Sequence, residues 1–172
     1  MKNISKVITT AVIAIAFSNS SFAQASATAA ASATIITPIS IVKNIDLNFG
    51  NVAVSASLAG TVVLAPAGTR TTGGAGGVTL PVENGTVAAA SFTVSGQATY
   101  TYAITLPTTA TISSGSNTMT VSTFTSTPAT TGTLSSGGTQ TLLVGATLNV
   151  TAGQASGTYT NSTGVPVTVN YN

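Results

Sequence analysis

The chain has 172 residues and a formal net charge of +2 at pH 7, with only four Lys or Arg and two Asp or Glu residues. It contains no Cys, His or Trp, which excludes disulfide staples, zinc sites built on Cys or His, and catalysis with a His base or a Cys nucleophile. The four charged residues after position 23 are Lys43, Asp46, Arg70 and Glu83, whose neutral sum disfavours binding to nucleic acid.

Residues 1–23 have the pattern of a secretory signal peptide. Lys2 and Lys6 form a basic start, residues 7–17 form an apolar run, and Ser21 and Ala23 place small residues at a cleavage site. The run is shorter than the ~20 apolar residues that span a membrane. We therefore expect export to the periplasm, then to the cell surface or the extracellular space, without membrane insertion.

The first part of the mature chain alternates between low complexity and short strand patterns. Residues 24–36 predict a flexible leader, and the apolar residues 35–42 carry Pro38, which confines them to a sheet edge or a strand start. Ile45, Leu47 and Phe49 alternate and end at Gly50. Residues 61–64 predict a short strand, and residues 71–77 (TTGGAGG) predict a flexible loop.

The second part repeats strand patterns between turn signals. Val78, Leu80 and Val82 alternate before a tight turn at Asn84-Gly85, and further strands are predicted around residues 92–94, 100–106, 119–124, 142–150 and 165–171. The apolar run 142–150 is the longest, which is typical of a central strand. About eight or nine strands without a helical period predict an all-β sandwich or barrel over residues 37–172.

The terminal strand carries the clearest alternation in the chain. Val165, Val167, Val169 and Tyr171 occupy alternate positions, as expected of a strand with one buried face. The pattern continues to within one residue of the end. Such a strand must pair on both sides, be covered, or be completed by another molecule.

Few side chains could support chemistry. Asp46 and Glu83 are the only carboxylates beyond residue 23, and nothing in the sequence brings them together for acid–base work. We expect no enzyme activity, no cofactor and no metal. Lys43 could form an intramolecular amide with an Asn beside a buried acid, but we favour its interpretation as an exposed residue that protects a strand edge.

Four segments carry a resemblance to a known family: ATIITPISIVKNIDLNFGNVAV (residues 33–54), GTVVLAPAGTR (60–70), GTQTLLVGATLNV (138–150) and GTYT (157–160). They resemble a family of secreted bacterial proteins described as domain of unknown function 4402, over essentially the whole mature chain. This resemblance implies no particular activity.

A looser resemblance is to the pilins of the chaperone–usher class, closest to the archaic and spore-coat-U-like branch. The matching residues are Ile45, Leu47, Phe49 and Gly50 in an early strand, Gly157 and Tyr159 in a glycine-x-tyrosine motif, and Val165, Val167, Val169 and Tyr171 in the terminal strand. The resemblance implies an incomplete immunoglobulin-like sandwich, completed first by a periplasmic chaperone and then, at an outer-membrane usher, by the N-terminal extension of another subunit.

Two features depart from that class. The chain lacks the cysteine pair common in such pilins, and residues 27–33 offer small side chains where large apolar ones are expected. Ile35 and Ile36 are the larger apolar candidates in the donor segment, residues 24–36. We expect a pilin-like subunit that assembles with like subunits. The alternatives are a self-contained sandwich that acts as an adhesin or matrix component, and a small outer-membrane barrel, for which the strands are short and the aromatic residues few.

Overall fold

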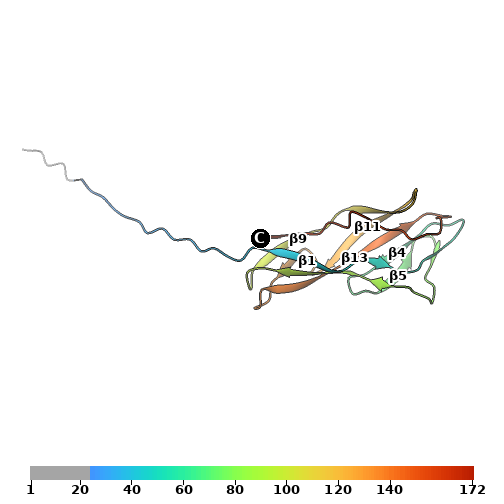
Figure 1. Cartoon of the computed structure of the whole chain (residues 1–172), viewed down its shortest axis with the longest axis horizontal. Helices are drawn as coiled ribbons and strands as arrows, with labels where there is room; N and C mark the ends of the chain where they lie inside the picture. Colours follow the sequence, from blue (N-terminus) through green and yellow to red (C-terminus); the bar gives the residue numbers. More distant parts are fainter. Residues whose placement is uncertain (1–23) are drawn as a thin grey trace, which may run out of the picture. The chain divides into compact units, whose positions relative to one another are not determined.

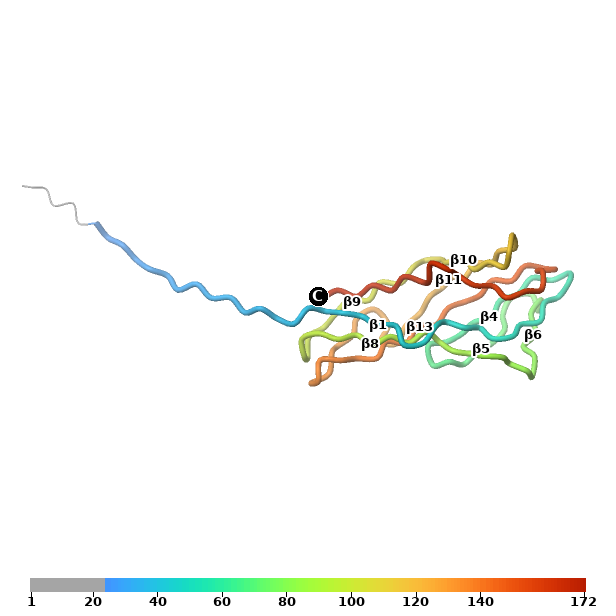
Figure 2. The backbone as a smooth tube through the Cα atoms, viewed as in Figure 1, coloured from blue at the N-terminus to red at the C-terminus, as the bar shows by residue number. Residues whose placement is uncertain are grey.

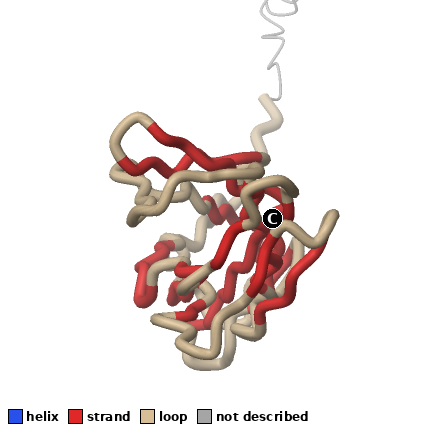
Figure 3. The backbone as a smooth tube through the Cα atoms, turned by 90° about the vertical axis from the view of Figure 1, so that its right-hand side faces the viewer, coloured by secondary structure: helices blue, strands red, loops and turns tan. Residues whose placement is uncertain are grey.

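The computed structural model describes residues 24–172, so the predicted signal peptide lies outside the described residues. The chain divides after Ile35 into a leader and a domain of residues 36–172. In the leader, residues 24–35 are exposed and belong to no strand. All regular elements of residues 24–172 are strands (Figures 1 and 3), which confirms the all-β prediction. No helix among these residues is long and apolar enough to cross a membrane.

The larger sheet is antiparallel and centres on β13, as the long apolar run 142–150 predicts. Its order is β1-β8-β13-β11-β10, with β4 also paired to β13 and β5 paired to β4. The bounds are β1 (Ser40–Ile45), β4 (Gly60–Leu64), β5 (Arg70–Gly73), β8 (Ala90–Ser95), β10 (Thr109–Ser114), β11 (Asn117–Thr127) and β13 (Thr139–Val150).

The second sheet is smaller and has the order β12-β9-β14. Its strands are β9 (Thr101–Thr105), β12 (Thr131–Thr133) and β14 (Thr168–Tyr171). Two short antiparallel pairs lie in the connection between β1 and β8: β2 (Asn48–Phe49) with β7 (Val87–Ala88), and β3 (Ala53–Val54) with β6 (Val78–Thr79). The chain is therefore a β-sandwich with one extended and one short layer.

The strand order is that of an immunoglobulin-like sandwich. The run β1-β8-β13-β11 follows the order A-B-E-D of one immunoglobulin sheet, while β9 and β14 take the places of strands C and F in the other. In a complete sandwich strand G lies on the free side of strand F. Within residues 24–172, β14 pairs only with β9, and the place of strand G carries no strand.

Several predicted boundaries were wrong, for identifiable reasons. The predicted TTGGAGG loop contains most of β5, because Thr71–Gly73 complete a ladder with β4. The predicted strand through Leu80 and Val82 is reduced to β6, because Pro81 follows and cannot donate to a ladder. Val82 is 95% exposed as a result.

Other strands were missed or shortened. β10 and β12 consist mainly of Thr, Ser and Gly, so they lack a strong apolar signal. The apolar run 35–42 becomes a strand only from Ser40, beyond Pro38. The terminal alternation begins at Val165, but ladder pairing with β9 begins only at Thr168.

The core is divided into two clusters, and only one of them lies between both sheets. The first cluster packs side chains of the larger sheet against Phe49 and Val78 from the β1–β8 connection. The second cluster includes Tyr102, Val169 and Leu134 from the smaller sheet or its borders. Because β9 and β14 contribute to the second cluster alone and β12 to neither, the first cluster lacks a regular second layer.

Tyr102 is the largest fully buried side chain. Its hydroxyl lies 2.7 Å from Oε1 of Gln140, to which it donates a hydrogen bond. Burial removes the phenol from water, which disfavours the anion and raises the pKa of Tyr102. In the folded state Tyr102 is therefore a neutral phenol that is hydrogen-bonded to Gln140.

We expect Tyr102→Phe to lower the free energy of unfolding by about 1–2 kcal/mol at pH 7, because Oε1 of Gln140 loses its donor in the core. Above about pH 10 the unfolded tyrosine ionises while the folded one does not, so wild-type stability falls as pH rises. The difference between wild type and Tyr102→Phe should therefore shrink above that pH. Urea unfolding from pH 7 to pH 11 measures it, with Tyr100→Phe, at a ring 44% exposed, as the control.

Candidate functional site

A groove opens where the first core cluster lacks its second layer. It has a volume of about 1310 Å³ and lies between residues 43–54 on one side and residues 154–165 on the other. In Figure 2 residues 43–54 are teal and residues 154–165 are red, and the two segments run along one another. The first wall is an interrupted strand edge, the second is a segment with one ladder bridge at Thr160, and the floor between them is apolar.

The first wall is an interrupted edge strand. β1 pairs with β8, β2 with β7 and β3 with β6, so residues 40–54 find their ladder partners on one side throughout. Across the groove from these partners, no strand of the described domain pairs with this segment. The first wall therefore presents a free edge to the groove.

The second wall is formed by the segment that leads into β14. β14 pairs antiparallel with β9, from Tyr171 opposite Tyr102 to Thr168 opposite Thr105. Farther along, Thr160 forms an isolated bridge to Ser113 of β10 in the same register, with N···O distances of 2.9 and 3.0 Å.

The two pairings are separated by a stretch without a ladder. Pro107 lies in the gap on one strand and Pro166 in the gap on the other, and neither can donate a ladder hydrogen bond. The shared register nevertheless keeps residues 160–171 beside residues 102–113. The second wall is therefore also paired on one side only.

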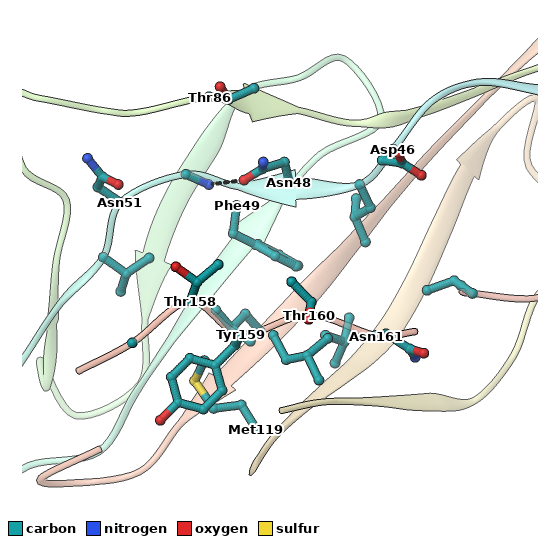
Figure 4. A pocket seen from close by; sticks show the side chains of 18 of the residues that line it. Asp46, Asn48, Phe49, Asn51, Thr86, Met119, Thr158, Tyr159, Thr160 and Asn161 are labelled. Carbon is teal, nitrogen blue, oxygen red and sulfur yellow. Dashed lines mark hydrogen bonds between the residues drawn. The ribbon is translucent and has the colours of Figure 1, made fainter. Parts of the chain in front are cut away.

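The floor of the groove consists of side chains from β11, β13 and the first wall. Val121, Leu148, Val150 and Phe49 all line it and are between 2% and 8% exposed. Ile112 and Met119 are half-buried and complete the lining from β10 and β11. Figure 4 shows Phe49 directed from the first wall toward Thr158–Thr160 on the second, with Met119 beside Tyr159.

Gly50 produces a sharp turn in the first wall. Its φ is +68°, and a Cβ at this position would lie 2.3 Å from the carbonyl oxygen of Asn84. No other residue type fits both the conformation and the space. The amide of Gly50 donates to Oδ1 of Asn48 at 2.9 Å, a bond drawn in Figure 4.

The guanidinium of Arg70 holds this turn in place with three hydrogen bonds. Its Nη1 donates to the carbonyl oxygens of Phe49 at 2.6 Å and Asn51 at 2.7 Å, and its Nη2 donates to Oδ1 of Asn84 at 2.8 Å. Asn51 in turn donates from its backbone amide to the carbonyl of Asn84 at 2.7 Å. The planar guanidinium thus holds the first wall against the loop that precedes β7, and sequence reasoning gave no indication of this contact.

Tyr171 lies beyond the groove lining, in the part of β14 that packs against the second core cluster. Its hydroxyl accepts a hydrogen bond from the amide of Gln97 at 2.6 Å and donates to the carbonyl of Thr37 at 2.7 Å. The ring stands edge-on to Tyr100, with centroids 5.8 Å apart. A Cβ at Gly96 would lie 2.2 Å from the Tyr171 hydroxyl, so the tyrosine needs a glycine there. Tyr171 therefore joins the segment before β1 to the strand of the second wall.

The other end of the second wall is held by polar side chains. Nε2 of Gln154 donates to the carbonyl of Thr118 at 3.2 Å and to the hydroxyl of Tyr159 at 2.9 Å. The Tyr159 hydroxyl donates to the carbonyl of Ala155 at 2.8 Å. Gly157 is exposed, and a Cβ there would lie 2.5 Å from Oγ of Ser114.

The structure brings most of the residues predicted from the sequence to this groove. Leu47, Phe49 and Gly50 line the first wall, while Gly157, Tyr159 and Val165 line the second. The other predicted residues lie elsewhere. Val167, Val169 and Tyr171 pack into the second core cluster, Ile36 is half-buried at the start of the domain, and Ile35 is 97% exposed.

The charged residues form no cluster. Lys43 and Asp46 make an exposed ion pair at 2.5 Å on the first wall, a type that contributes little to stability. Glu83 makes no salt bridge within the described chain. Residues 24–172 contain no group of three or more His, Cys, Asp or Glu that could hold a metal ion.

The family model for Domain of unknown function (DUF4402) matches residues 39–171. The chain belongs to this family. The match covers both walls and the floor of the groove, and it includes Tyr171. Neither the search of curated proteins nor the search of solved structures found a match.

We expect Arg70→Lys to lower the free energy of unfolding by about 1.5–3 kcal/mol, because one ammonium cannot serve the three oxygens that the planar guanidinium reaches. The amide of Asn51 should also exchange faster with solvent. Lys43→Gln, on the same wall, is the matched control and should change stability by less than about 0.5 kcal/mol. Equal changes in the free energy of unfolding for the two substitutions, measured in urea, would contradict the role of Arg70 in holding the first wall.

Proposed function

We propose that this chain is a non-enzymatic structural subunit, exported from a bacterial cell and assembled on its surface by β-strand complementation. The observation that carries the proposal is the groove itself. An interrupted strand edge and the segment that leads into β14, each paired on its outer side, face one another across an apolar floor beside the place of the missing strand G. A strand supplied by another molecule would pair with both walls and cover the half-buried part of the floor, Ile112 and Met119.

The described side chains favour a structural role over catalysis. Asp46 is paired with Lys43 and exposed, and Glu83 does not line the groove. Apart from the paired Lys43 and Asp46, the polar groups of the groove walls are hydroxyls, amides and backbone groups, which suit a peptide strand better than they suit bond-breaking chemistry. The charge balance of Lys43, Asp46, Arg70 and Glu83 also gives no reason to expect nucleic acid as a partner.

The partners that fit this function are like subunits, together with a periplasmic chaperone that protects the groove and an outer-membrane usher that directs assembly. Such a chaperone would add a strand to the same free edges before a subunit does. The basic start and apolar run of residues 1–23 support export by a cleaved signal peptide. The donor candidate remains the leader, residues 24–36.

One observation favours a second function, a self-contained sandwich that acts as an adhesin or matrix component. Val169 is 8% exposed, and Val167 and Tyr171 also pack into the second core cluster. The strand of the second wall is thus anchored without any other molecule. In this alternative the groove would hold a ligand, or none, and the protein would remain a monomer.

A substitution in the groove floor separates the two functions. We expect Met119→Lys in the full chain to abolish filaments and SDS-resistant ladders, because a strand laid on the floor would bury the ammonium. The monomer should stay folded, since Met119 is half-buried and a lysine stem can keep its head in water. Thr120→Lys is the matched control, because Thr120 lies next along β11 on the opposite face.

The measurement is negative-stain electron microscopy and unboiled gels of material sheared from producing cells, with thermal unfolding of each monomer. Ladders from Thr120→Lys but not from Met119→Lys are the expected result. Equal ladders from both variants would show that assembly does not use the groove. A wild-type protein that is only monomeric would favour the self-contained sandwich.

A further inference from the structure

The leader has two chemically different faces. Its side chains alternate with a period of two, so an extended leader directs all odd-numbered side chains to one side. No charged residue occurs from position 24 to position 42. The odd face carries Ala25, Ala27, Ala29, Ala31 and Ala33 and ends at Ile35, and the even face carries Gln24, Ser26, Thr28, Ser32 and Thr34, interrupted by Ala30.

Much of the groove floor is already filled by the domain's own side chains, and only its half-buried residues, such as Ile112 and Met119, remain partly open. Val121, Leu148 and Val150 are at most 3% exposed, and Phe49 is 8% exposed, although all four line the groove. The domain's own side chains therefore already occupy the space under the groove into which the side chains of an incoming strand would point. What remains open is the space between the walls, where a backbone with short side chains fits and long ones overpack.

Length and charge also fit the leader. Extended, residues 24–35 span about 40 Å at ~3.3 Å per residue, enough to follow a wall formed by residues 43–54. The leader carries no charge that would be buried against the floor.

The connectivity favours the leader of a second copy over the subunit's own. The carbonyl of Thr37 accepts a hydrogen bond from the Tyr171 hydroxyl, and the amide of Thr37 donates to Oε1 of Gln97 at 3.3 Å. β1, which follows at Ser40, leads directly into the first wall. A leader entering its own groove would have to reverse direction beside this fixed point.

We propose that the alanine face of one copy's leader lies on the groove floor of a second copy, and that small side chains on this face are what the groove selects. This inference rests on the proposed function. Pairing then comes from backbone hydrogen bonds to both walls, and specificity comes from the exclusion of bulk beneath the strand. The Ser/Thr face points to solvent.

A two-face scan in the full chain tests the proposal. Ala29→Leu and Ala29→Asp should each reduce SDS-resistant ladders at least about tenfold, by overpacking and by burying a charge respectively. Thr28→Leu and Thr28→Asp, one residue away on the even face, make matched changes in size and charge. They should leave the ladders within about twofold of wild type, because a side chain there stays in water.

Each outcome has a distinct meaning when Met119→Lys is measured in parallel. If Met119→Lys and both Ala29 variants lose the SDS-resistant ladders while both Thr28 variants keep them, both proposals are supported. If Met119→Lys blocks assembly but Ala29→Leu assembles as well as or better than wild type, the groove accepts a strand without selecting small side chains, and this inference is overturned while the proposed function stands. If Met119→Lys assembles normally, both proposals fall.

Discussion

The two walls of the groove share one constraint, which is that each satisfies its backbone hydrogen-bonding groups on one side only. Peptide N–H and C=O groups need partners, from protein or from water. In residues 40–54, the strands β1, β2 and β3 pair with β8, β7 and β6, and in residues 160–171, Thr160 bridges to β10 and β14 pairs with β9. The sides that face the groove depend on water or on another strand. The division of the core follows from the same constraint, since the first cluster lacks the layer that a paired strand would provide.

The groove keeps its shape because each wall is fixed by contacts outside the gap. Arg70 and Gly50 hold the first wall at its turn, and Tyr171 joins β14 to the segment before β1 through Thr37. These contacts do not fill the groove. They prevent the walls from collapsing toward each other, which is what two free edges beside an apolar floor would otherwise favour. A preformed site loses less conformational entropy when a strand binds than a flexible one would.

The sequence predicted the parts of this arrangement that depend on local alternation. Leu47 and Phe49, and the series from Val165 to Tyr171, face inward as the period of two requires. It did not predict β10, because only Ala110 and Ile112 mark its inner face among Thr and Ser. Nor did it predict Arg70 as a clamp, because the oxygens that it binds come from segments more than ten residues away. Which strand edges remain free is a property of the whole topology, and no local pattern encodes it.

Free edges usually carry protection against indiscriminate pairing, such as a lysine, a proline or a bulge. Each device occurs beside this groove. Lys43 is paired with Asp46, Pro166 lies in the stretch without a ladder, and the register of β1 against β8 shifts between Lys43 and Ile45. A groove that is protected against every strand could not assemble, and one that accepted any apolar strand would promote aggregation. The selection of small side chains proposed for the leader would resolve this conflict, because it would reject the large apolar side chains typical of aggregation-prone segments and still accept a backbone with methyl groups.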